Sequence, residues 1–280
     1  MKKQIKLMPR DQLIFKHLAE FEISTKKILH RTFFEGLRMG AVDSTVRRLD
    51  NRGVGYLYSR NAPGCGTPYF RLTKAGTRYL GIKFSNQPMK ISRIFTLMAR
   101  LYFINRPPKG IQRALCTDTT LPKLIACEAY KTGKMRPPRV DFYIAQNKIE
   151  TVEDRQLAFG AILPDLNSGV DRVVRRCLKH SMSFVERGWF IDVMKAGRFE
   201  WTILTGHQAK QEELQQTVTR VLRRRMSSLY FDNALDLLNV PPIRVKVEVI
   251  PELANLRLLK KKKKAIRDSS QSVPRPRKNN

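Results

Sequence analysis

The chain has 280 residues, of which 42% are hydrophobic, enough for one large or two modest domains with their own cores. It carries 54 Lys and Arg residues against 24 Asp and Glu residues, and this formal net charge of +30 favours a polyanionic partner such as DNA, RNA or an anionic membrane surface. The absence of any run of about 18 apolar residues excludes a membrane-spanning helix, and we expect a cytoplasmic protein without a membrane partner.

The cysteines do not indicate a disulfide framework or a metal centre. Cys65, Cys116, Cys127 and Cys177 form no C-x-x-C pair, and no histidine lies at ligand spacing from them. Isolated cysteines of this kind are typical of free thiols in a reducing compartment. We therefore expect no metal ligands and no cofactor.

Residues 41–53 predict a short helix that a glycine stops. Asp43 or Ser44 is suited to its N-cap, and Val46 and Leu49 lie on one face at i,i+3 spacing. The other face is polar and basic. A short basic helix of this kind can be a solvated surface helix, or it can be the DNA-reading helix of a helix-turn-helix.

Two more helices precede this segment, and a basic hairpin follows it. Apolar periodicity predicts helices at residues 10–21 and 25–34, the second capped by Ser24, with His17 at the edge of the core. Strand-like runs at residues 54–59 and 69–72 are joined by a turn-rich segment, and Thr73 is suited to cap another helix. Three short helices and a hairpin are the complete plan of a winged helix-turn-helix, which we expect at residues 1–85.

The remainder predicts an α/β domain at residues 90–252 and a disordered basic tail at residues 253–280. Residues 90–104 are apolar nearly all round, which predicts a buried helix. The other expected elements are strands at 139–145 and 149–153, a helix at 169–187 capped by Asn167 or Ser168, a hairpin of 189–195 with 199–205, a helix at 208–239, and a strand at 243–250.

Several motifs of the first half resemble the replication-relaxation family of plasmids and integrative mobile elements. They are the Pro-Arg-Asp at residues 9–11, the helix pair that follows, residues 45–49, and the Tyr-Phe-Arg-Leu-Thr-Lys-Ala-Gly run at 69–76. The similarity covers residues 9–225. It implies an α+β protein, with an N-terminal winged helix-turn-helix and a C-terminal α/β domain similar to a degenerate restriction-endonuclease-like fold.

The chain departs from that fold where a nuclease needs its catalytic residues. Such a nuclease holds Mg²⁺ with an Asp on one strand and an acidic-x-Lys motif on the next. Asp141 is the candidate for the first position, but Glu150 is followed two residues later by Val152, and Asp192 has the wrong spacing to Lys195. We therefore expect no catalytic residues, and a nuclease that uses Asp141 and Glu150 is the alternative to a pure binding function.

The patterns together favour a sequence-specific protein that binds double-stranded DNA. It would belong to a plasmid or mobile element and act in transcription regulation, or as an accessory factor in replication or conjugative transfer, also within a nucleoprotein complex with other proteins. An RNA-binding protein is a further alternative, because the net charge favours it equally. The expected base-reading residues are Ser44, Thr45, Arg47 and Arg48. The other expected DNA-binding residues are Arg52, Arg60, Arg71, Lys74, Lys260, Lys261, Lys262, Lys263 and Lys264.

Overall fold

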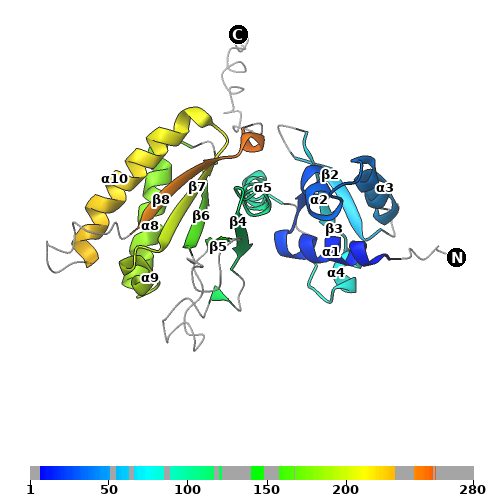
Figure 1. Cartoon of the computed structure of the whole chain (residues 1–280), viewed down its shortest axis with the longest axis horizontal. Coiled ribbons are helices and arrows are strands. Elements are labelled where there is room, and N and C mark those ends of the chain that lie inside the picture. Colours follow the sequence, from blue (N-terminus) through cyan, green and yellow to red (C-terminus); the bar gives the residue numbers. More distant parts are fainter. Residues whose placement is uncertain are drawn as a thin grey trace, which may run out of the picture.

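The protein has a mixed α+β fold, as expected, built on both sides of one central helix, α5 (Ile91–Asn105) (Figure 1). An N-terminal part (residues 7–84) lies on one side of α5, and a C-terminal part (residues 106–256) lies on the other. The computed structural model describes residues 7–50, 55–62, 66–84, 89–116, 120–121, 140–147, 158–166, 168–230, 243–254 and 256.

The N-terminal part packs its helices against a three-stranded antiparallel sheet of order β1-β3-β2. Alternation along the hairpin of β2 and β3 turns Leu57, Phe70 and Leu72 into the core, where they meet apolar residues of the helices. The elements are α1 (Pro9–Phe21), β1 (Ser24–Thr25), α2 (Lys26–Phe33), α3 (Gly40–Leu49), β2 (Leu57–Asn61), β3 (Pro68–Leu72) and α4 (Lys74–Tyr79).

Threonine side chains fix the start of two of these helices. The Thr73 hydroxyl accepts a hydrogen bond from the Gly76 N–H at 3.2 Å, which confirms the expected cap of α4. The cap of α2 is Thr25, whose hydroxyl accepts from the Ile28 N–H at 3.4 Å. The expected cap, Ser24, is one residue too early, because the Ser24 hydroxyl contacts the His17 ring instead of the first turn of α2.

The C-terminal part contains a five-stranded sheet of order β4-β5-β6-β7-β8. Its first three strands form an antiparallel meander, whereas β6, β7 and β8 are parallel, with α8 and α10 as their crossovers on one face of the sheet. Helix α5 covers the other face. The elements are β4 (Ile111–Leu115), β5 (Asp141–Asn147), β6 (Ala158–Pro164), α8 (Val170–Glu186), α9 (Ile191–Lys195), β7 (Phe199–Thr205), η1 (Gln208–Lys210), α10 (Gln211–Tyr230), β8 (Arg244–Val249) and η3 (Pro251–Leu253).

Helix α5 is buried on nearly every side, which confirms the expectation for this segment. Its apolar side chains form one cluster with Phe21 and Tyr69 of the N-terminal part and with Ile162 of the sheet. Leu253 and Leu256 join the same cluster and are 0% and 5% exposed. The folded part therefore continues to Leu256, and the boundary expected before residue 253 is too early.

Other expectations for the C-terminal part are wrong in detail. Residues 191–195 form the short helix α9 where a strand was expected, and β7 pairs with β6 and β8 instead of closing a hairpin. Helix α8 begins after Gly169 without a side-chain cap, while the Ser168 hydroxyl donates to Asp165. Strands β4 and β6 were not anticipated, and the strand expected at 149–153 lies outside the described residues.

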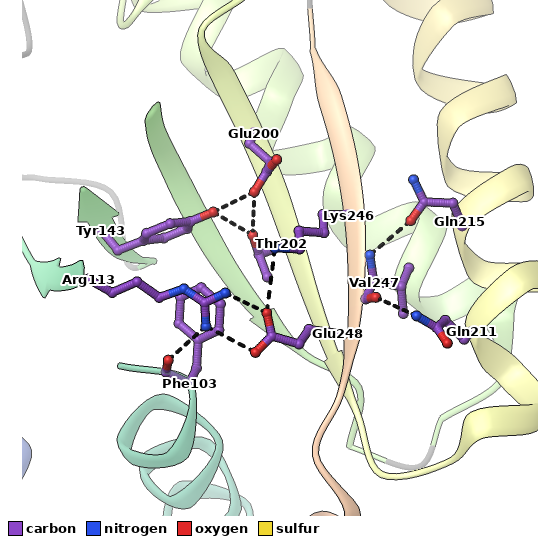
Figure 2. A network of polar contacts seen from close by, with 10 residues as sticks. All are labelled: Phe103, Arg113, Tyr143, Glu200, Thr202, Gln211, Gln215, Lys246, Val247 and Glu248. Carbon is purple, nitrogen blue, oxygen red and sulfur yellow. Dashed lines mark hydrogen bonds and ion pairs between the residues drawn. The ribbon is translucent and has the colours of Figure 1, made fainter. Parts of the chain in front are cut away.

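Side chains of α10 cover the outer edge of β8. The Gln215 amide oxygen accepts from the Val247 N–H at 2.8 Å, and the Gln211 amide donates to the Val247 carbonyl at 3.0 Å (Figure 2). The Gln215 amide nitrogen also donates to the Val245 carbonyl. A strand edge with unpaired backbone groups invites pairing with another chain. The two glutamines therefore form hydrogen bonds with backbone groups of β8 that would otherwise be free to pair with another strand.

His17 is a buried histidine at the boundary of α1 and β1. Its Nε2 atom lies 3.0 Å from the Ser24 hydroxyl, and its ring packs against Phe21 with the ring centroids 4.7 Å apart. Burial lowers the pKa of His17 from 6.5 to about 4. The side chain is therefore neutral in the folded protein at physiological pH.

We expect this histidine to destabilise the fold in acid. Between pH 6.5 and about 4 the unfolded chain binds a proton that folded His17 does not, so stability falls as the pH drops through this window. The full shift corresponds to on the order of 3 kcal/mol. Urea unfolding at neutral and mildly acidic pH should show a smaller loss for His17→Gln than for the wild type. His207→Gln, at a partly exposed histidine, is the control, and an unchanged loss in His17→Gln would contradict the assignment.

Candidate nucleic-acid interface

Helix α3 lies at the outer end of the N-terminal part and divides into an apolar and a polar face (Figure 1). Val46 and Leu49 are 8% and 0% exposed and pack in the core, as expected. Ser44 and Arg47 are exposed. Arg47 forms no ion pair within the part of the chain that the structure describes, so its guanidinium is available to a ligand.

Arg48, the neighbour of Arg47, is engaged with α1. Its Nη2 atom lies 2.6 and 2.9 Å from the two carboxylate oxygens of Asp11, a residue that is 1% exposed. Asp11 also accepts the Met8 N–H at 2.7 Å. Because a buried carboxylate without a partner is costly, this contact attaches α3 to α1. The structure thus separates Arg48 from the other expected base readers and places it in a contact within the protein.

The start of α3 also differs from the expectation. The helix begins at Gly40, and neither Asp43 nor Ser44 caps it. Asp43 instead forms an ion pair with Lys26 of α2 at 2.5 Å, and the Ser44 hydroxyl donates to the Gly40 carbonyl at 3.1 Å. Thr45 lines a hollow between α3 and the start of α1. The ion pair joins α2 to α3, and Ser44 remains at the surface.

The hairpin of β2 and β3 presents two arginines around one tyrosine. The register pairs Tyr58 with Arg71, and the guanidinium carbons of Arg60 and Arg71 lie 5.5 and 5.8 Å from the Tyr58 ring centroid. A cation–π contact orders an arginine without neutralising its charge. Lys74 is exposed at the start of α4, directly after this hairpin. The sequence reasoning missed Tyr58, although its alternation with Arg60 was a usable signal.

The remaining expected DNA-binding residues lie outside the described part of the chain. They are Arg52 and the five lysines Lys260, Lys261, Lys262, Lys263 and Lys264.

Asp141, the candidate nuclease residue, lies at the start of β5 and contacts a buried arginine of α5. The Arg100 Nη1 atom donates to its carboxylate at 3.2 Å. On the neighbouring strand β6, the register places Gly160 and Ile162 on the same face as Asp141. Neither side chain can bind a metal ion or take the place of the acidic residue or the lysine that such a nuclease needs on this strand. Glu150, the other candidate, lies outside the described residues.

The same face of the sheet carries a network of charged side chains around Arg113. Its two Nη atoms donate to the two carboxylate oxygens of Glu248 at 3.0 and 2.6 Å, and Nη1 also donates to the Phe103 carbonyl at 2.8 Å (Figure 2). Lys246 lies 3.7 Å from the same carboxylate. The arginine therefore connects β4, β8 and the end of α5.

A second group in Figure 2 is centred on Tyr143. Its hydroxyl donates to Glu200 at 2.6 Å and lies 2.6 Å from the Thr202 hydroxyl, two strands away. A Cβ atom on Gly160 would lie 2.5 Å from the Tyr143 ring, so only glycine lets this side chain cross β6. Burial, and then the Glu200 charge, raise the pKa of Tyr143, so the hydroxyl stays protonated. It acts as a hydrogen-bond donor, not as a base.

Among the described residues, no three His, Cys, Asp or Glu side chains lie close enough to hold a metal ion. Within the same residues, no helix is both long and apolar enough to cross a membrane. No family model, no curated protein and no solved structure matches this chain.

The two adjacent arginines of α3 should differ in their effect on stability. Arg48→Ala removes the partner of buried Asp11, and we expect it to lower the free energy of unfolding by about 1–3 kcal/mol. Arg47→Ala removes an exposed side chain, and its effect should stay within about 0.5 kcal/mol. Urea unfolding at neutral pH measures both. Equal effects of the two substitutions would contradict the Arg48–Asp11 assignment.

Proposed function

We propose that the protein binds duplex DNA in a sequence-specific manner and that α3 enters the major groove. The observation that carries this proposal is the polar face of α3, where exposed Arg47 and Ser44 lie opposite a buried apolar stripe. The element order, three helices followed by the hairpin of β2 and β3, supports a winged helix-turn-helix. An exposed arginine on such a helix can donate two hydrogen bonds to guanine O6 and N7.

Two exposed cations and one half-buried arginine of this part suit contacts to phosphates. Arg60 and Arg71 on the hairpin and Lys74 on α4 carry charges that no described carboxylate neutralises. Phosphate contacts of this kind fix the position of a protein on the duplex, whereas base contacts determine the sequence it selects. In this assignment Arg47 reads bases, with Ser44 and Thr45 beside it, and Arg48 holds α3 in place through Asp11.

The C-terminal part supports a role in binding more than one in cleavage. The order α5-β4-β5-β6-α8-β7, with an antiparallel meander followed by a parallel strand, fits the proposed restriction-endonuclease-like fold. Where a nuclease of that fold has its catalytic residues, however, Asp141 contacts Arg100. On the neighbouring strand β6, the residues on the same face are Gly160 and Ile162. With the motifs of the N-terminal part, this arrangement suits a protein of a plasmid or integrative element that regulates transcription or assists replication or DNA transfer.

Arg47→Ala should reduce sequence discrimination. A duplex selected by the wild-type protein from a random library provides the preferred sequence, and fluorescence anisotropy compares it with a scrambled duplex. We expect the variant to lose about 1–3 kcal/mol of discrimination while its affinity for the scrambled duplex largely survives. Arg198→Ala, at an exposed arginine of the C-terminal part, is the matched control and should behave like the wild type.

Three results would change this assignment. Equal losses on both duplexes would mean that Arg47 contacts only phosphate. An Arg47→Ala variant with unchanged affinity for both duplexes would show that α3 is not the reading helix. Stronger binding to structured RNA than to either duplex would favour the RNA-binding alternative.

The affinity should also depend steeply on salt. If six or more phosphates are contacted, binding should weaken about 10³-fold or more between roughly 50 and 200 mM salt, because each contact releases counterions. Removal of residues 257–280, which hold the lysine run, should weaken binding to all sequences alike. A nearly flat salt response would contradict an electrostatic interface.

A further inference from the structure

The outer surface of α8 and α10 carries a second group of exposed cations, which we call the α8–α10 face. Arg172, Arg175 and Lys179 follow one another along the side of α8 that points away from the sheet. Arg220 and Arg223 are exposed on α10. The opposite sides of both helices are buried against the sheet.

The two helices that carry these cations pack against each other. Because α8 and α10 follow neighbouring parallel strands on the same face of the sheet, they run in the same direction. Lys179 and Arg220 are equally far from the first residues of their helices, Val170 and Gln211. All five cations are therefore exposed on one pair of neighbouring, parallel helices.

No carboxylate of the described residues neutralises these cations. None of the five forms an ion pair with a described carboxylate, whereas Arg100, Arg106 and Arg113 all do so around α5. The pKa of His180 on α8 is lowered, first by burial and then by the charges of Arg176 and Lys179. The acidic side chains of the two helices lie at their ends, at Asp171, Glu186, Glu212 and Glu213.

The α8–α10 face points away from the N-terminal part. The sheet and α5 lie between them, and α10 and α3 occupy opposite ends of the long axis of the molecule (Figure 1). A straight duplex that lies on α3 therefore cannot also lie on this face. Any duplex on the α8–α10 face is a second segment.

We propose that the α8–α10 face binds the phosphate backbone of a second segment of duplex DNA, so that one chain joins two segments. Guanidinium groups match phosphate geometry with two parallel hydrogen bonds. An anionic membrane fits less well, since interfacial helices expose large apolar side chains and only Met182, at 36%, is exposed among those of α8. That a first duplex segment binds at α3 rests on the function proposed above.

The number of duplexes bound per chain tests this inference. The full-length protein is titrated with a short fluorescent duplex well above the dissociation constant, and light scattering gives the number of chains in each complex. The test variant combines Arg172→Glu, Arg175→Glu and Lys179→Glu. The matched control combines Lys109→Glu, Arg198→Glu and Arg244→Glu, three exposed cations of the same part that lie away from the α8–α10 face and change the net charge equally.

We expect two duplexes per chain for the wild type and the control, and one for the test variant. If α3 does not bind DNA, the wild type binds one duplex and the test variant none, so the two proposals fail in different ways. A test variant that binds as many duplexes as the wild type overturns the inference, as does an equal loss in the control. A test variant that loses anionic-vesicle or duplex-RNA binding but keeps both DNA segments overturns it too.

Circular dichroism shows whether the test variant is folded. The milder combination of Arg175→Gln and Lys179→Gln provides a second measurement, because it removes charge at exposed positions without adding carboxylates. It should weaken binding of the second duplex at least several-fold and leave the first unchanged. Full retention of the second duplex in this folded variant would also overturn the inference.

Discussion

The burial of α5 is the constraint on which the rest of the structure depends. A helix that is apolar on nearly all sides needs a partner on each side, and the N-terminal part and the sheet supply one each. A fully buried Leu or Phe side chain contributes about 1.5–3 kcal/mol relative to exposure, so neither part could lose α5 without exposing several such side chains. The two parts therefore share the apolar cluster around α5, in addition to the cluster that each part forms by itself.

Buried arginines set the position of α5 within that core. Arg100 donates to Asp141 on β5 and to the Glu20 carbonyl at the end of α1, and so joins both parts through a single guanidinium. Arg113 joins Glu248 to the Phe103 carbonyl near the end of α5. Because an unpaired buried charge is strongly unfavourable, a rotation or slide of α5 would break these pairs. Hydrophobic contacts alone would tolerate such a shift, since they are not directional.

The sequence predicted the elements whose signal is local. Apolar periodicity located α1, α2 and α8, and a segment that is apolar on nearly all sides located α5. Thr73 was correctly predicted as the N-cap of α4. Pairing between distant segments could not be predicted in this way: Arg113 and Glu248 are 135 residues apart. Residues 191–195 were mistaken for a strand because a short apolar run fits a strand and a buried helix equally well. The basic face of α3 was predicted, but the ion pair of Arg48 could not be, because only the fold brings Asp11 near it.

Arg47 and Arg48 show how the same residue type serves two purposes in adjacent positions. Asp11 is buried and must be paired, so it takes the arginine within reach, while the next arginine stays exposed. With 24 carboxylates against 54 cations, the chain has too few acidic partners for most of its Lys and Arg residues. Which cations form ion pairs within the protein therefore depends on where these few carboxylates lie. Cations without such a partner remain on α3, on the hairpin of β2 and β3, and on α8 and α10, where their positive potential attracts anions.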